Sequence, residues 1–104
     1  ETDWTADTGA TNHMTGTTKV LTNLNTYTGP DGVKMGNGTT AKIAGIGSSI
    51  LKQKNSTVPL KHVLYVPALT KNLLSVSQLT SNEPVNCEFT NVGFSVKDRT
   101  TGQL

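Results

Sequence analysis

The sequence has few of the residues on which several common classes of protein depend. It contains one cysteine, Cys87, in 104 residues, which excludes an internal disulfide and fits a reducing compartment. No apolar run approaches the roughly 20 residues that a membrane-spanning helix needs. Lysine and arginine are scattered singly and the net charge is +2, so we expect no nucleic-acid-binding arm. These shortages favour a small globular domain without disulfides.

Metal ligands are also scarce. His13 and His62 are the two histidines, and neither lies close to Cys87 in sequence. A zinc site needs about four ligands, commonly at short spacings, so we expect no metal. We interpret His13 as a structural residue and Cys87 as a core residue, since nothing near Cys87 in sequence would activate its thiol. Alternation along residues 60–66 would place the side chain of His62 on the opposite face from Lys61.

Long runs of helical periodicity are missing too, whereas Thr, Asn, Gly, Ser and Val are abundant. Turn-forming groups interrupt the chain at short, regular intervals, at residues 29–32, 36–38, 54–57, 91–93 and 99–102. This pattern predicts an all-β fold, a small barrel or sandwich, in a single domain over residues 1–104. The chain begins with Glu1 rather than Met, and we expect it to be a fragment of a longer protein.

Local patterns predict where the elements lie. Asn37-Gly38 stands between two β-like runs, 33–35 and 41–46, and favours a hairpin with a type I′ turn, in which both central residues have positive φ. The other expected elements are a short strand at 4–6, a buried strand at 60–66 closed by Pro67, a short helix over 72–79, and a hairpin over 87–104.

The stretch WTADTGATNHM, Trp4 to Met14, carries one aspartate on a turn of small and hydroxylated residues. Two carboxylates that share a proton can hydrolyse a peptide without a metal, because like charges about 3 Å apart do not both ionise. In that chemistry, Asp7 would be one carboxylate, and Gly9 would allow the partner and its water to approach. The Thr8 hydroxyl would lock the loop, and the small Ala10 would leave room for a substrate backbone.

The chain has one Asp-Thr-Gly triplet. Asp31 lies in a Gly-Pro-Asp-Gly turn with no strand ahead of it, and Asp3 and Asp98 lack the small-residue context. If Asp7 is catalytic, its partner must therefore be Asp7 of a second copy, related by a two-fold axis. The triplet alone leaves open the alternative that Asp7 only forms an Asx-type turn, which is the more common role of such a short match.

Three blocks, in the order WTADTGATNHM, VKMGNGTTAKIAGIGS and LKHVLYVPALTKNLLSVSQL, together resemble the protease region of copia-type LTR retrotransposon polyproteins. The blocks run from Trp4 to about Leu79, and the KDRTTGQL tail also resembles the segment between protease and integrase in those polyproteins. The resemblance implies a retropepsin-like fold, which is a small closed all-β barrel with a flap hairpin and one short helix. One such domain would form half of a two-fold dimeric enzyme.

The resemblance also implies roles for individual residues. In this family's pattern, residues 72–79 pack behind the catalytic loop, where Ser75 takes the place of a glycine that is usual in retroviral relatives. Six residues precede Asp7, fewer than in the retroviral enzymes, which build their dimer from both termini. The implied site comprises the catalytic Asp7 with Thr8 and Gly9, the cleft residues Ala10, Thr11 and Asn12, and the flap residues Met35, Gly36, Asn37, Gly38 and Thr39.

The implied function is that of an aspartic endopeptidase, which acts as a homodimer on its own Gag-Pol polyprotein precursor and needs no cofactor. The implied location is intracellular and cytoplasmic, within virus-like particles, with no membrane or nucleic-acid partner for this domain. The alternative hypothesis is a catalytically silent retropepsin-fold monomer that acts as an interaction module. A third hypothesis is a scaffold segment that places the neighbouring regions of the polyprotein. Oligomeric state and activity at high concentration would separate these hypotheses.

Overall fold

The structure is a computed structural model that describes residues 4–53, 57–82, 85–90 and 93–98. It confirms the all-β fold with one short α-helix. The elements, in chain order, are β1 (Trp4–Asp7), β2 (Met14–Thr15), the 3-10 turn η1 (Thr18–Val20), β3 (Thr22–Thr26), β4 (Gly32–Lys34), β5 (Thr40–Lys42), β6 (Gly45–Lys52), β7 (Thr57–Tyr65), β8 (Asn72–Ser75), α1 (Val76–Asn82), β9 (Val85–Thr90) and β10 (Gly93–Asp98). No helix in the described part of the chain is long and apolar enough to cross a membrane.

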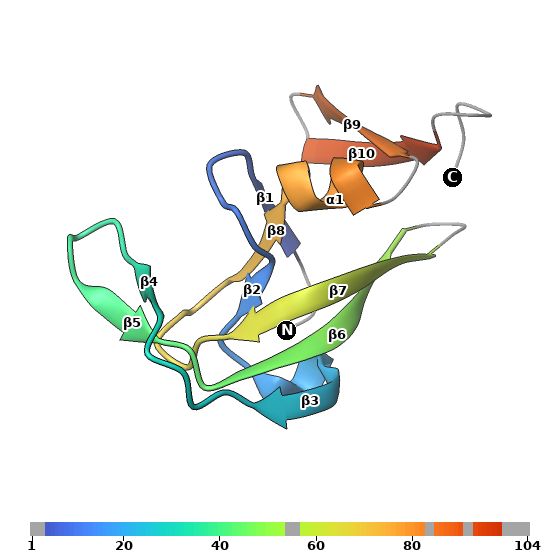
Figure 1. Ribbon diagram of the computed structural model, residues 1–104. Helices are drawn as coiled ribbons and strands as arrows, with labels where there is room; N and C mark the ends of the chain where they lie inside the picture. The colour runs from blue at the N-terminus through green and yellow to red at the C-terminus, as the bar shows by residue number, and fades with distance from the viewer. Residues whose placement is uncertain (1–3, 54–56, 83–84, 91–92, 99–104) are drawn as a thin grey trace.

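A six-stranded sheet forms the body of the domain. Its strand order is β1-β8-β2-β7-β6-β3, and it curls into a half-barrel (Figure 1). Strand β8 lies between β1, to which it is parallel, and β2, to which it is antiparallel. Strands β6 and β7 form the long antiparallel hairpin of the sheet. The hairpins β4–β5 and β9–β10 are separate two-stranded sheets at opposite sides of the half-barrel in Figure 1.

Two clusters of apolar side chains make up the core. In β6, alternate residues are buried, so that one face of the strand is turned inward. The main cluster fills the half-barrel and contains Leu51, Val58, Leu60, Val63, Leu74, Leu79 and Val96, with Trp4 and Leu21 packed against it. The second cluster contains Ala10, Met14, Ala41, Ile43 and Val66. Val33 and Met35 of the β4–β5 hairpin pack against this second cluster, which anchors the hairpin on the sheet.

The expected alternation fails at His62. Gly47 pairs with Val63 and Ser49 pairs with Leu60, so two residues of β7 face one residue of β6. His62 takes up the extra residue with a φ of 56°, and both it and Lys61 are exposed. The prediction that their side chains lie on opposite faces is therefore wrong, because a β-bulge resets the alternation.

The helix expected over residues 72–79 begins later than predicted. Residues 72–75 form strand β8, and α1 starts at Val76. The helical assignment of 72–75 is wrong because this segment is placed between two other strands, whose backbone groups hydrogen-bond to it. Ser75 ends the strand and caps the helix, since its Oγ accepts a hydrogen bond of 3.2 Å from the backbone N–H of Gln78.

The hairpin around Asn37-Gly38 is confirmed, but its turn differs from the expected one. Met35 C=O accepts from the N–H of Gly38 at 2.9 Å, and the N–H of Met35 donates to Thr39 C=O at 2.7 Å. Gly38 has a φ of 89°, whereas the only non-glycine residues with positive φ in the described ranges are Asn23 and His62. The connection is thus a three-residue loop closed by a left-handed glycine, not a type I′ turn.

The remaining expected strands are also present. Strand β1 covers the strand expected at 4–6, and β7 covers residues 60–65 of the buried strand expected at 60–66. Strands β9 and β10 form the C-terminal hairpin. The turn signals at 54–57, 91–93 and 99–102 fall wholly or partly outside the described residues, as does the side chain of Cys87.

Candidate active site

Asp7 ends strand β1, at the point where the chain turns sharply. Its backbone carbonyl accepts a hydrogen bond of 3.4 Å from the N–H of Ala10. Its side-chain Oδ1 accepts a hydrogen bond of 2.9 Å from the N–H of Gly9. These bonds give the carboxylate, which is half-buried, a defined orientation on a tight turn. Oδ2 of Asp7 has no hydrogen-bond partner among the described residues, so one carboxylate oxygen remains available to a substrate, a water or a second carboxylate.

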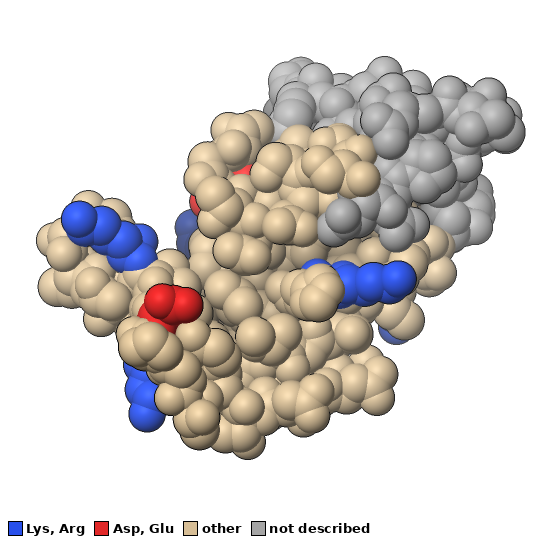
Figure 2. All heavy atoms as spheres, in the orientation of Figure 1, with Lys and Arg blue, Asp and Glu red and all other residues tan. Residues whose placement is uncertain are grey.

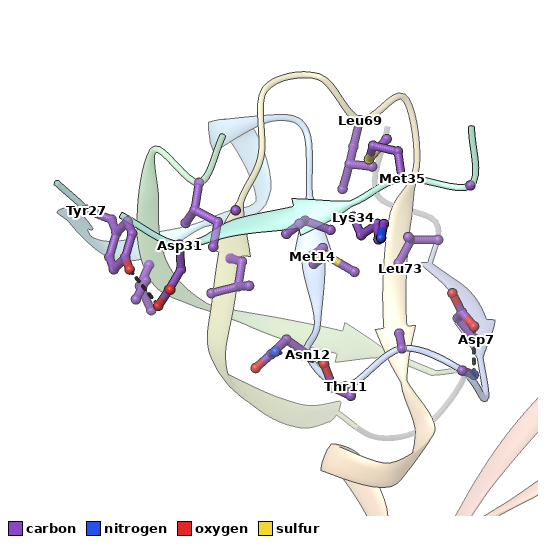
Figure 3. Close-up of a pocket in the computed structure, with 18 residues that line it drawn as sticks. Asp7, Thr11, Asn12, Met14, Tyr27, Asp31, Lys34, Met35, Leu69 and Leu73 are labelled. Atoms are coloured by element: carbon purple, nitrogen blue, oxygen red, sulfur yellow. Dashed lines mark hydrogen bonds between the residues drawn. The ribbon is translucent and has the colours of Figure 1, made fainter. Parts of the chain in front are cut away.

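A groove of about 660 Å³ lies between this turn and the β4–β5 hairpin (Figure 3). Seven of the eleven predicted site residues line the groove, namely Asp7, Gly9, Ala10, Thr11, Asn12, Met35 and Gly36. Thr8, Asn37, Gly38 and Thr39 do not line it. Thr8 is exposed on the turn after β1. Asn37, Gly38 and Thr39 are exposed residues of the loop that joins β4 to β5. The tertiary structure thus brings the loop after β1 and the start of the hairpin loop to one groove.

The groove also contains residues that were not predicted as site residues. Most are apolar side chains of the sheet and of the loop before β8, and their spacing along the sequence gave no signal of a common site. The additional lining residues are Met14, Tyr27, Asp31, Gly32, Val33, Lys34, Ile43, Ile46, Leu64, Leu69 and Leu73.

Asp31 is the second carboxylate of the groove, and it lies far from the first. Oδ2 of Asp31 accepts a hydrogen bond of 3.1 Å from the hydroxyl of Tyr27. Figure 3 shows this pair at the opposite end of the groove from Asp7. Asp31 therefore does not form a carboxylate pair with Asp7 within one chain.

Behind the Asp7 turn, Ser75 joins three segments of the chain. The hydroxyl of Ser75 donates to the backbone carbonyl of Ala10 at 2.8 Å, and its backbone N–H donates to Nδ1 of His13 at 2.9 Å. Ser75 is also the Cα partner of Asp7 in the parallel β1–β8 ladder. Ser75 is thus fully buried and makes several hydrogen bonds.

His13 is buried, with 2% of its surface exposed, as expected for a structural residue. Burial lowers the pKa of its imidazole to about 4, because a charged ring is poorly solvated there. Its Nδ1 accepts a hydrogen bond, so the neutral ring carries its proton on Nε2. Within the described ranges, no three His, Cys, Asp or Glu side chains come together as metal ligands.

Three charged residues line the groove, namely Asp7, Asp31 and Lys34. On the face shown in Figure 2, the lysine side chains of the described residues are separated from one another and do not form one continuous patch.

Residues 4–84 match the family described as Pol polyprotein, beta-barrel domain. The chain belongs to this family. It is 40% identical over 100 residues to the retrovirus-related Pol polyproteins from transposons RE1 and RE2 of Arabidopsis thaliana, a match that covers 96% of this chain and 7% of each relative. It is also 40% identical over 77 residues to the retrovirus-related Pol polyprotein from transposon TNT 1-94 of Nicotiana tabacum, covering 72% of this chain and 6% of that protein. No solved structure matches the chain.

These similarities confirm the resemblance to copia-type retrotransposon polyproteins. Residues 4–84 thus match a beta-barrel domain of Pol polyproteins, and the chain spans about 7% of the length of the Arabidopsis relatives.

Proposed function

We propose that this domain is an aspartic endopeptidase that acts as a homodimer, with one Asp-Thr-Gly turn from each copy. One observation carries the proposal: the half-buried Asp7 carboxylate is oriented by the N–H of Gly9, at 2.9 Å, on the wall of a groove that the β4–β5 hairpin borders. A turn that only reversed the chain would not need its carboxylate to face such a groove.

The chemistry requires a second carboxylate beside Asp7. Asp31 lies at the other end of the groove, so the second carboxylate would come from Asp7 of another copy. A two-fold axis through the site would pair the two residues and let them share one proton. The ionised carboxylate would take a proton from a water that attacks the scissile carbonyl, and the protonated one would give its proton to the leaving nitrogen. Activity would therefore be confined to the pH window between the two macroscopic pKa values of the pair.

The proposed substrate is an extended peptide of the polyprotein that contains this domain. Apolar side chains, among them Met14, Ile43 and Leu73, line part of the groove and would accept apolar side chains of the peptide. The backbone of the peptide would pair with residues 11–12 and with the hairpin, as in strand addition. Met35 and Gly36 would close over the peptide as part of the flap. Processing of this kind would take place in the cytoplasm, in virus-like particles, and would need no metal or other cofactor.

The test is self-processing of a longer precursor that includes both flanks of this domain. Wild-type protein, Asp7→Asn and Asp31→Asn are compared across a range of concentrations near pH 5 to 7. Asp31→Asn is the matched control, because it removes a carboxylate from the same groove but not from the Asp7 turn. We expect cleavage to vanish in Asp7→Asn, to persist in Asp31→Asn, and to rise faster than linearly with wild-type concentration.

Two outcomes would contradict the proposal. Cleavage by Asp7→Asn at the wild-type rate would show that Asp7 is not catalytic. A wild-type precursor that stays intact and monomeric at the highest concentration would instead support the silent interaction module. Thermal melting of Asp7→Asn controls for folding, since Asn has nearly the same shape as Asp.

A further inference from the structure

The turn that carries Asp7 is held from behind by a residue far away in the sequence. Ser75 contacts the segment between Asp7 and His13 at two points, the backbone carbonyl of Ala10 and the imidazole of His13. These hydrogen bonds are 2.8 and 2.9 Å long and bridge sequence separations of 65 and 62 residues. Both are buried, which strengthens them relative to exposed bonds.

We propose that His13 and Ser75 are positioning residues for Asp7, and that together they fix the catalytic turn relative to the strand–helix junction at β8 and α1. This inference rests on the proposed function, because it assigns these residues a role in the reaction of Asp7. Neither residue lines the groove, so neither is expected to touch the substrate.

A chain of hydrogen bonds connects Ser75 to the carboxylate. The hydroxyl of Ser75 holds the carbonyl of Ala10, and the N–H of Ala10 bonds to the backbone carbonyl of Asp7. The adjacent N–H of Gly9 bonds to Oδ1 of Asp7. A shift of Ala10 would therefore be transmitted to both ends of the Asp7 residue, its backbone and its side chain.

The contribution of His13 is to hold Ser75 itself. The backbone N–H of Ser75 lies where β8 ends and α1 begins, and Nδ1 of His13 satisfies it. At the same time, the carbonyl of His13 accepts from the N–H of Leu64 at 2.9 Å, which fixes the end of the turn to β7. His13 thus joins the turn, the junction and the sheet, and an apolar side chain of the same size could fill its space but not accept the bond from Ser75.

Four variants separate positioning from packing. His13→Leu and Ser75→Ala each remove one group of hydrogen bonds and leave the groove lining unchanged. His13→Asn is the conservative control, because its Oδ1 can accept the hydrogen bond that Nδ1 accepts in the wild type. Leu74→Met, a change of similar volume in a buried neighbour of Ser75 that does not line the groove, controls for a general disturbance of the segment.

The first measurement is the steady-state cleavage of a peptide substrate. We expect His13→Leu and Ser75→Ala to lower kcat by about 10- to 100-fold, because misplacement of a catalytic group by about 1 Å has effects of that size. KM should stay within about twofold, since the groove is intact, and His13→Asn should recover most of kcat. Equal loss of activity in His13→Asn and His13→Leu, or losses no larger than the unfolded fraction found by thermal melting, would overturn the proposal.

The second measurement does not need activity. Backbone ¹⁵N order parameters of Gly9 and Ala10, measured by NMR at pH 7, report how firmly the turn is held. We expect them to fall in His13→Leu and Ser75→Ala and to stay at the wild-type value in His13→Asn, while Val63 in the core stays rigid in all variants. Unchanged values at Gly9 and Ala10 would overturn the proposal. If wild-type protein does not cleave at all, the proposed function fails, and this measurement still decides whether His13 and Ser75 hold the turn.

Discussion

The side-chain amide of Gln53 forms two hydrogen bonds to the backbone of Val96. Its Nε2 donates to the Val96 carbonyl at 3.3 Å, and its Oε1 accepts from the Val96 N–H at 3.1 Å. The side chain of Val96 is 3% exposed and belongs to the main core cluster. Strand β10 is therefore attached to the end of the β6–β7 hairpin, although the family match ends at residue 84. The C-terminal hairpin thus contacts the half-barrel through Val96.

Gln53→Ala should weaken this attachment. Both hydrogen bonds would be lost, and we expect the free energy of unfolding to fall by about 1–2 kcal/mol. Amide hydrogen exchange should become faster at Val96, whose N–H loses its acceptor. Gln53→Glu is the control that retains an acceptor oxygen, so its Val96 amide should exchange more slowly than that of Gln53→Ala. Identical exchange at Val96 in wild type and Gln53→Ala would contradict the importance of this contact.

Tyr27→Phe should loosen the segment that leads into the β4–β5 hairpin. The hydrogen bond of 3.1 Å between Tyr27 and Asp31 spans residues 27–31, directly before β4. Because this hydrogen bond is exposed to solvent, the loss of stability should be below about 1 kcal/mol. We expect KM for a peptide substrate to rise by about two- to fivefold, the equivalent of about 0.4–1 kcal/mol of binding, with little change in kcat. Asp31→Asn keeps an acceptor for the Tyr27 hydroxyl and should leave KM nearer to the wild-type value.

The stability of the domain should depend on pH through His13. Burial lowers the pKa of His13 from its ordinary value of 6.5 to about 4 in the folded chain. Between these two values the unfolded chain binds more protons at this residue, so the free energy of unfolding falls as the pH is lowered through this window. The total loss is about 3 kcal/mol, reached below the folded pKa, and no loss from His13 occurs above about pH 7.

The difference between wild type and His13→Asn isolates this effect from that of the carboxylates. Denaturant unfolding at a series of pH values from 7 to 4 should show a steeper decline for wild type than for His13→Asn. Parallel curves for the two proteins would mean that His13 titrates normally.

Gly16→Ala should destabilise the domain, whereas Gly36→Ala should not. A Cβ at Gly16 would overlap the carbonyl oxygen of Leu69 and lie 2.8 Å from the carbonyl carbon, both of which are backbone atoms that move only with their loop. A Cβ at Gly36 would meet nothing within 4 Å, and the φ of Gly36 is not in the left-handed region. We expect Gly16→Ala to cost about 1–3 kcal/mol, measured by thermal or denaturant unfolding, and Gly36→Ala to stay within about 0.5 kcal/mol of wild type. Equal stability of the two variants would contradict the close packing at Gly16.

Elements with a strong local signal could be predicted from the sequence. The hairpin at Asn37-Gly38 follows from a glycine flanked by alternating runs, and the strand at 60–66 follows from its β-branched apolar residues. The Asp7 turn follows from the small residues around it. In each case the residues that predict the element lie within about ten positions of one another in the sequence.

Features that depend on distant partners could not be predicted in this way. Residues 72–75 have the spacing of a helix, yet they form β8, because β1 and β2 flank them on both sides. The β-bulge at His62 depends on the register with β6. The roles of Ser75 and His13 depend on one hydrogen bond between residues that are 62 positions apart.

The sequence by itself determined the all-β class and the position of the hairpins, because local turn chemistry and alternation specify them. The resemblance of three ordered blocks to a known family singled out Asp7 as the candidate catalytic residue. Only the tertiary structure decided which apolar side chains line the groove, that Asp31 lies far from Asp7, and that Ser75 is hydrogen-bonded to the turn. The physical reason is that a buried polar group needs a hydrogen-bond partner, which the fold can supply from any part of the chain. Sequence spacing does not specify that partner.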